Sequence, residues 1–216
     1  MSSSQRFRFL CVIDFEATCD DYNVNHGDQL QEIIEFPAVL LDTEVLKVVD
    51  TFQVFIKPEV EPILTDFCKN LTGITQDQID NGINLLDAMK RFDDWLHVTH
   101  SVISTGLERN FAIATDGPWD IKNMLFNDCK RKNILDYFHD VKYYSEWVNV
   151  RRMYKSEYGR AGGITSQLQG LNMTFEGKEH CGLDDAKNIA RIVIKMITDG
   201  KVFKLNDRLR GKKKEK

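Results

Sequence analysis

The sequence lacks the cysteine patterns that build disulfide frameworks or zinc sites. It holds five cysteines, an odd number, and no two of them are spaced as a CxxC pair. Disulfide-rich secreted domains and structural zinc modules depend on such spacing. We therefore expect reduced thiols in an intracellular protein of the cytoplasm, the nucleus or both.

Long apolar runs are also absent. A helix that crosses a bilayer needs roughly 20 consecutive apolar residues. The longest apolar stretch near the N-terminus is interrupted by Asp14, and no cleavage pattern follows it. We therefore expect neither a signal peptide nor a membrane span, and no membrane among the partners of this protein.

The chain has no repeat, no linker and no excess of positive charge. Its 216 residues predict one domain over residues 1–205. The chain has 29 Lys and Arg residues and 33 Asp and Glu residues, which gives a net charge of −4. This balance argues against a protein that coats nucleic acid, but not against an enzyme that grips a few phosphates through metal ions. The basic residues 206–216 predict a disordered tail, or else a phosphate-binding or nuclear-import patch.

Apolar segments of strand length recur along the chain. Residues 7–15 are apolar on both alternating faces, which predicts a strand buried inside a sheet. Residues 33–41 and 45–56 predict two more strands, joined as an antiparallel hairpin because their connection is short. Further short strands are expected at 111–115 and 147–150.

Helical patterns alternate with these strands, so we expect an α/β fold with a mixed sheet. Thr75 begins a capping box, Asn84 can cap an amphipathic helix, and Pro118 is suited to the first turn of another. Residues 99–110 are polar and predict a loop. The expected helices cover residues 62–71, 85–98, 118–131 and 184–198, with a further one after Thr75.

Two carboxylates follow the first expected strand. Asp14 and Glu16 are two residues apart, so on a strand they point to the same face. Like charges on one face raise each other's pKa unless a bound cation keeps both ionised. A metal site is one explanation of this pair, and simple solvation of Glu16 beyond the strand end is the other.

The last helix also carries an acid at the head of its apolar stripe. Asp185 is followed at helical spacing by Ile189, Ile192 and Met196. Its neighbour Asp184 suffices as the N-terminal cap or dipole partner. Asp185 is therefore free to be a metal ligand.

Three further residues suggest a nucleic-acid enzyme. Asp120 lies in the first turn of its expected helix, where the helix dipole alone favours an acid. Trp119 is either a core aromatic or a surface on which a nucleobase stacks. His180, in a loop near Asp185, can take a proton near neutral pH. Four carboxylates and one imidazole suit a pair of divalent metal ions of the kind that cleave phosphodiesters.

The sequence contains, in order, the segments DFEATC, QEIIEFPAVLLD and LTGITQDQID, the pair Trp119–Asp120, and the segment HCGLDDAKNIA. Together they resemble the DEDDh exonucleases, and more closely the Eri-type (enhanced-RNAi, 3′ histone-mRNA exonuclease-like) 3′→5′ exoribonucleases. The resemblance runs from about Phe9 to about Gly200. It implies a ribonuclease-H-like fold, with a mixed central sheet flanked by helices.

The same resemblance implies the roles of five residues. It places metal ligands at Asp14, Glu16, Asp120 and Asp185, and a general base at His180, with Glu16 and His180 as the catalytic pair. Two Mg²⁺ ions, or Mn²⁺ in their place, would serve the release of 5′-mononucleotides from RNA 3′ ends.

The resemblance also implies a binding place for the terminal nucleotide. Ala17, Thr18 and His180 would contact this nucleotide, and Phe67 and Trp119 would sandwich its base. Packing within the helix at 62–71 is the other explanation of Phe67.

Three alternatives stay open on the sequence alone. The substrate could be DNA or very short oligonucleotides, because contacts to a ribose 2′-hydroxyl often come from backbone groups. The chain could instead be a non-catalytic RNA-binding scaffold, although its acid set is intact. A protein partner could supply targeting, and the oligomeric state is open.

Overall fold

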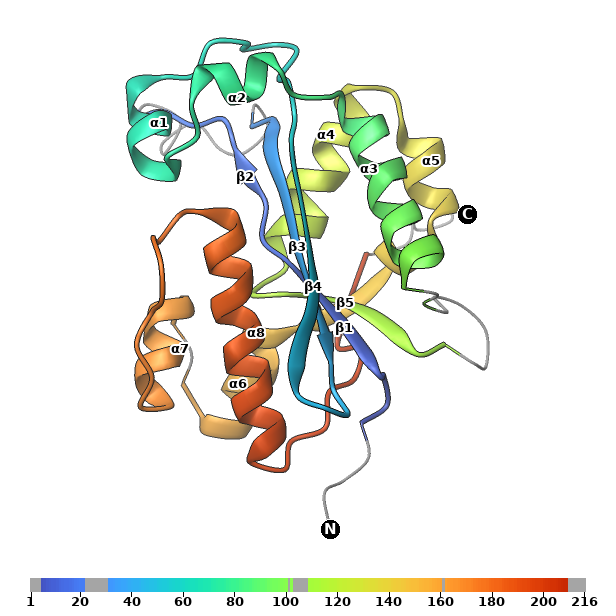
Figure 1. Ribbon diagram of the computed structural model, residues 1–216, viewed down its shortest axis with the longest axis vertical. Coiled ribbons are helices and arrows are strands. Elements are labelled where there is room, and N and C mark those ends of the chain that lie inside the picture. Colours follow the sequence, from blue (N-terminus) through green and yellow to red (C-terminus); the bar gives the residue numbers. More distant parts are fainter. Residues whose placement is uncertain (1–4, 22–30, 101, 103–108, 161, 210–216) are drawn as a thin grey trace, which may run out of the picture.

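A mixed β-sheet forms the centre of the protein (Figure 1). The computed structural model describes residues 5–21, 31–100, 102, 109–160 and 162–209. Seven strands lie in the order β2-β3-β1-β5-β6-β7, with β4 also paired to β3. The β1–β5 and β5–β6 pairs are parallel, and the other pairs are antiparallel. The strands are β1 (Phe9–Ile13), β2 (Glu16–Ala17), β3 (Ile33–Asp42), β4 (Lys47–Phe55), β5 (Phe111–Thr115), β6 (Glu146–Asn149) and β7 (Asp207–Arg208).

Strand β1 lies inside the sheet, as its unbroken apolar sequence predicts. It pairs with β3 on one side and with β5 on the other. Cys11 and Ile13 pack into a hydrophobic cluster on one face, and Leu10 and Val12 pack into a second cluster on the opposite face. The predicted hairpin is also confirmed, since β3 and β4 pair antiparallel and all of β3 is buried.

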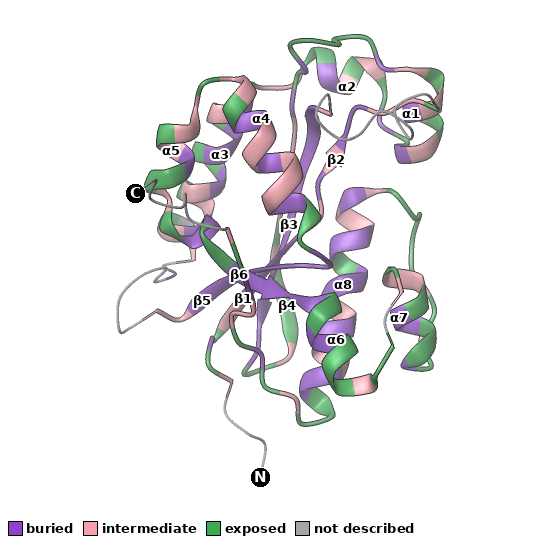
Figure 2. Ribbon diagram, turned by 180° about the vertical axis from the view of Figure 1, so that it is seen from behind, coloured by how far each residue is buried: buried purple, intermediate pink, exposed green. Residues whose placement is uncertain are grey.

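Helices cover both faces of the sheet (Figures 1 and 2). One face packs against α8 and the shorter α6 and α7, and the other packs against α3, α4 and α5. These helices are α3 (Leu85–Asp94), α4 (Phe126–Arg131), α5 (Leu135–Asp140), α6 (Val150–Tyr158), α7 (Ile164–Gly170) and α8 (Gly182–Thr198), with π-helical turns η3 (Trp95–Thr99) and η4 (Asp120–Leu125) and the 3₁₀ turn η5 (Lys142–Tyr144). The predicted α/β fold with a mixed sheet flanked by helices is confirmed.

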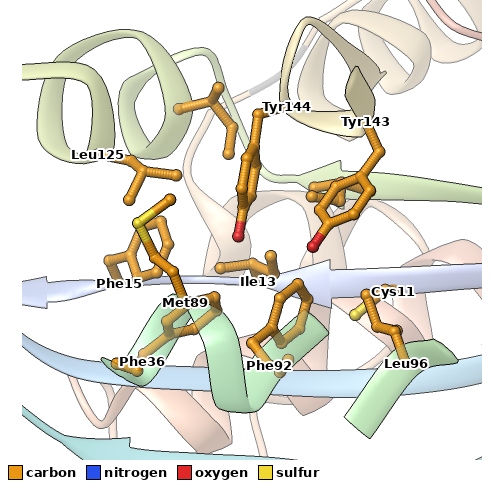
Figure 3. Close-up of a cluster of buried hydrophobic side chains, with 14 of the residues drawn as sticks. Cys11, Ile13, Phe15, Phe36, Met89, Phe92, Leu96, Leu125, Tyr143 and Tyr144 are labelled. Atoms are coloured by element: carbon orange, nitrogen blue, oxygen red, sulfur yellow. The ribbon is translucent and has the colours of Figure 1, made fainter. Parts of the chain in front are cut away.

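Aromatic side chains fill the space between the sheet and α3 (Figure 3). Phe92 of α3 and Phe36 of β3 have ring centroids 4.6 Å apart. Phe15, just beyond β1, places its ring 4.7 Å from that of Phe36. Because neighbouring side chains of an extended chain alternate, this packing turns Asp14 and Glu16 toward the opposite face, where α8 lies.

Two short helices, α1 (Asp66–Thr72) and α2 (Gln76–Asp80), extend the molecule beyond β2. The capping box predicted at Thr75 is present at the start of α2. The predicted helix at 62–71 begins later, because the side chain of Thr65 accepts a hydrogen bond from the N–H of Cys68 and so caps α1.

Three helices escaped the sequence prediction. Helices α5, α6 and α7 have six, nine and seven residues. Helices this short are marginal by themselves and depend on tertiary packing. The helix predicted from Pro118 to about residue 131 is present, although its first part is π-helical. No helix in the described part of the chain is long and apolar enough to span a bilayer.

Residues 206–209, which belong to the predicted tail, continue the described chain and contact the sheet. The amide of Asn206 donates to the carbonyl of Asn149 over 3.0 Å, and β7 pairs with β6. The buried carboxylate of Asp207 accepts from Lys122 over 2.6 Å. These contacts bring 206–209 into the fold. The rest of the predicted tail, 210–216, and most of the predicted loop at 99–110 lie outside the described residues.

Candidate active site

The site begins at a break between β1 and β2. Pairing with β3 stops at Ile13 and resumes at Glu16, so Asp14 and Phe15 lie in between. The backbone N–H of Phe15 instead donates to Oδ1 of Asp120 over 3.0 Å. This hydrogen bond ties the first turn of η4 to the end of β1.

Carboxylates from the two ends of the chain meet at this break. One oxygen each from Asp14, Glu16 and Asp185 lies within 4.8 Å of the others. Asp14 and Glu16 are half-buried, Asp185 is buried, and Asp120 beside them is also buried. The four predicted acids therefore line one cleft.

Helix α8 reaches the strand end because its first residue has no side chain. A Cβ on Gly182 would lie 2.7 Å from the carbonyl oxygen of Asp14 and 2.8 Å from Cγ of Pro37. Asp185 follows within the first turn, where its N–H donates to the carbonyl of Cys181 over 2.9 Å. The glycine thus sets the distance between the acids of β1–β2 and that of α8.

Of the two roles predicted for Asp184, N-terminal cap or dipole partner, the structure fits the second. The N-cap of α8 is Cys181, which makes no side-chain capping hydrogen bond. Asp184 lies inside the first turn, and its Oδ2 accepts from the backbone N–H of Lys178 over 3.1 Å. Its charge remains well placed for the helix dipole.

Burial raises the pKa of every acid in this cluster. The pKa of Glu16 rises to about 9, and those of Asp120 and Asp185 rise to about 7. The pKa of Asp14 lies well above its usual range because of burial and the charges of Asp120 and Asp185. Without a counter-charge the cluster therefore holds protons near neutral pH.

The donor set fits a hard divalent cation. It consists of carboxylate oxygens, the ligands that Mg²⁺ and Mn²⁺ prefer. The pKa values of Asp14 and Glu16 are raised mainly by burial and by the charges of neighbouring acids, both of which disfavour the ionised carboxylate. A bound cation would reverse this effect and keep the acids ionised.

A cleft of about 580 Å³ opens beside the acids. Trp119 lines it and is 40% exposed, so the explanation of this residue as a core aromatic is wrong. His180 also lines it, exposed, on a left-handed backbone with φ of 63°. Such a conformation is uncommon outside glycine and is often found at functional sites. The backbone of His180 lies beside the Asp185 carboxylate and moderates the rise of the pKa of Asp185 that burial causes.

Three other residues predicted to bind the nucleotide are not among the described residues that line the cleft. Ala17 and Thr18 are buried, and the hydroxyl of Thr18 accepts from the N–H of Glu32 over 3.0 Å. Phe67 is half-buried on α1 and belongs to none of the hydrophobic clusters of the described residues. The roles of these residues stay predictions.

The sequence prediction missed three charged residues near the site. Glu35 is buried opposite Glu16 in the pairing of β2 with β3, and its charge helps to raise the pKa of Glu16. Its place in the EIIE segment of a strand could have revealed it. Asp116 and Arg151 line the cleft as an ion pair. Their separation along the chain leaves no local pattern that predicts this contact.

Most of the chain is similar to known exonucleases. The RNase T family model, described as Exonuclease, matches residues 11–193. Human 3′-5′ exoribonuclease 1 is 37% identical over 206 residues, which cover 94% of this chain and 56% of the human protein. The chain thus spans little more than half the length of that relative.

Solved structures give the same result. The nuclease domain of 3′hExo, a DEDDh family member bound to rAMP, is 37% identical, with a TM-score of 0.86 over 96% of this chain and all of that one. A 3′-exonuclease structure concerned with 3′-end recognition of a histone mRNA stem-loop is 36% identical, with a TM-score of 0.84 over 96% of this chain and 89% of that one. The predicted ribonuclease-H-like fold is confirmed.

Proposed function

The chain belongs to the RNase T exonuclease family and to its Eri-type DEDDh branch, and we propose that it is a divalent-metal-dependent 3′→5′ exoribonuclease. It would release 5′-mononucleotides from the 3′ end of RNA. The observation that carries this proposal is the convergence of oxygens from Asp14, Glu16 and Asp185 within 4.8 Å of one another. Relatives named as exoribonucleases, and a related domain bound to rAMP, support RNA as the substrate.

The acids would hold the metal ions, two Mg²⁺ or Mn²⁺ in our proposal. Asp14, Glu16 and Asp185 would hold one ion, and Asp14 together with Asp120 would hold the other. When bound, such ions supply Lewis-acid stabilisation of the charge that develops on the phosphate and the leaving 3′-oxygen. The buried setting of Asp120 and Asp185 excludes water around these charges and strengthens their interactions.

His180 would act as the general base. Its imidazole lies in the same cleft as the acids, and a ring nitrogen of a neutral imidazole can accept a proton. It would remove a proton from the attacking water, which then attacks the last phosphodiester in line. Trp119, exposed in the cleft, would stack on the terminal base, with Phe67, Ala17 and Thr18 as the other predicted contacts.

The preference for RNA over DNA is tested directly by digestion. A 3′-end-labelled RNA oligonucleotide and the DNA of the same sequence would be digested side by side in Mg²⁺. We expect labelled mononucleotide from the RNA at the first time points, and slower release from the DNA. Equal or faster release from DNA would contradict the ribonuclease assignment, and labelled products longer than a mononucleotide would contradict stepwise cleavage from the 3′ end.

The proposal also covers the cellular compartment, the extent of the nuclease domain and a protein partner. The cysteines of the chain are free, and three of them are buried, which agrees with a reducing compartment such as the cytoplasm or the nucleus. We place the nuclease domain at residues 1–209, which extends the predicted domain to the end of the described residues. A protein partner that supplies targeting is compatible with this arrangement.

A further inference from the structure

The cleft that holds the acids has one arginine and no lysine among its described lining residues. This residue is Arg151, near the start of α6. The other charged residues that line the cleft are acidic, so Arg151 is the one guanidinium or ammonium group that the described lining offers to a phosphate. The lining acids are Asp14, Glu16, Asp116, Asp120, Glu179 and Asp185.

Arg151 is held in place by a buried carboxylate. Its backbone N–H donates to the carbonyl of Asp116 over 2.8 Å, and its Nε donates to Oδ2 of Asp116 over 3.0 Å. Nη2 donates to the same oxygen. The other oxygen, Oδ1, accepts from the amide of Gln167 over 2.5 Å. Both oxygens of the 5% exposed Asp116 are therefore engaged, and the guanidinium has a fixed orientation.

This arrangement uses one edge of the guanidinium and leaves another open. Asp116 occupies the edge formed by Nε and Nη2. Nη1 makes no hydrogen bond or ion pair with any described residue, and 47% of the Arg151 side chain is exposed. The edge formed by Nη1 and Nη2 can thus donate two parallel hydrogen bonds, the geometry in which arginine binds a phosphate.

We propose that Arg151 binds a backbone phosphate of the RNA strand in the cleft, and that Asp116 and Gln167 are its positioning residues. This inference rests on the proposed function, since it requires a nucleic-acid strand as the ligand. It assigns the cleft a phosphate contact that is independent of the metal ions.

The next residue along the chain provides a matched control. Arg152 also lies on α6, and its side chain is 55% exposed. Its guanidinium contacts Asp207 and the carbonyl of Asn206 instead, and it does not line the cleft. The two arginines therefore differ in position but hardly in chemistry or exposure.

The test compares two variants on a His180→Ala background, which slows cleavage enough for binding to be measured. One carries Asp116→Asn with Arg151→Gln, and the other carries Arg152→Gln. The double change keeps the net charge and leaves no buried charge without a partner. The affinity for a 5′-labelled single-stranded RNA is measured at several salt concentrations in Mn²⁺, and Mn²⁺ affinity is measured separately.

We expect the double variant to bind RNA roughly 10-fold more weakly at low salt. The slope of log K against log salt should fall by about 0.7, the value for one phosphate on a single strand. Arg152→Gln should keep the slope of the background protein, and both should keep its Mn²⁺ affinity. A full slope in the double variant would overturn the inference.

Two further outcomes keep the test decisive. If the double variant also loses Mn²⁺ affinity, the same measurements are made on Arg151→Lys. Lysine keeps the positive charge beside Asp116 but lacks the donor edge that Nη1 and Nη2 of the arginine offer to a phosphate. Weaker RNA binding with normal Mn²⁺ affinity supports the contact, and unchanged RNA binding overturns it. If the background protein itself binds no RNA, the proposed function fails and this inference fails with it.

Discussion

Single carboxylates decide what this site can do. Asp14, Glu16, Asp120 and Asp185 are partly or fully buried, and burial raises the pKa of each. Ionised carboxylates in such a setting are costly unless a cation compensates them. The metal ions in the proposed function supply this compensation, so each acid should be needed for metal binding as well as for cleavage.

Replacement of Asp185 by Asn should remove activity through loss of metal. The amide keeps the shape of the side chain but is a neutral, poorer ligand for a divalent cation. We expect no detectable cleavage of RNA in Mg²⁺ and a Mn²⁺ affinity at least 10-fold lower by calorimetric titration. Full activity of this variant in Mg²⁺ would rule out the proposed site.

Replacement of His180 by Ala should separate proton transfer from metal binding. A general base contributes roughly 10²–10⁴-fold to the rate. We expect kcat to fall within this range while Mn²⁺ affinity stays the same, since His180 is not in the cluster of Asp14, Glu16 and Asp185 that could hold an ion. Loss of Mn²⁺ binding would instead show His180 to be a ligand, and an unchanged rate would exclude it as the base.

At the scale of elements, the approach of α8 to β1 sets the geometry of the site. Sequence patterns predicted β1, the β3–β4 hairpin, the capping box and the apolar stripe of α8, because local spacing encodes each of them. They did not predict the short helices α5, α6 and α7, which depend on packing against the rest of the protein. The close contact of Gly182 could not be predicted from local sequence either, because the atoms that surround it come from distant parts of the chain.

Replacement of Gly182 by Ala should therefore damage activity more than stability. The added methyl group would lie 2.7 Å from the carbonyl oxygen of Asp14 and 2.8 Å from Pro37, so α8 and the backbone at Asp14 have to move apart. A displacement of about 1 Å can cost about 10²-fold in rate. We expect kcat to fall at least 10-fold with weaker Mn²⁺ binding, and thermal unfolding should show that the variant is folded. Normal kcat and Mn²⁺ affinity would show that the site tolerates the shift.

At the scale of the whole molecule, the fold brings together residues from both ends of the chain. The four acids and His180 were predicted from separate segments, and the structure places all of them around one cleft. Their meeting is encoded by the parallel β1–β5 pairing and by the packing of α8, so the family resemblance was needed to foresee it. The Asp116–Arg151 pair escaped prediction because no local pattern links its two residues.

The stability of the metal-free protein should fall as pH rises. Glu16, Asp120 and Asp185 have folded pKa values of about 9, 7 and 7, above those of unfolded chains, near 4. The folded state therefore binds more protons between these values, and the free energy of unfolding decreases as pH rises from about 4 to 9.

This decrease is measured as the Tm of the protein in EDTA at pH values between 5 and 9. A control series in saturating Mn²⁺ contains the same other titratable groups, so the difference in Tm between the two series isolates the acid cluster. Metal keeps the acids ionised, so the Mn²⁺ series should be flatter and the gap between the series should widen with pH. Asp185→Asn should narrow that gap. A gap that is constant across this range would contradict raised pKa values in the cluster.

The most direct measurement is anomalous diffraction from crystals of the protein soaked in Mn²⁺. We expect a peak within bonding distance of carboxylate oxygens of Asp14, Glu16 and Asp185, the kind of ligand that suits Mn²⁺. Ordered crystals with no peak at this place, or with these three side chains turned away from one another, would contradict the account.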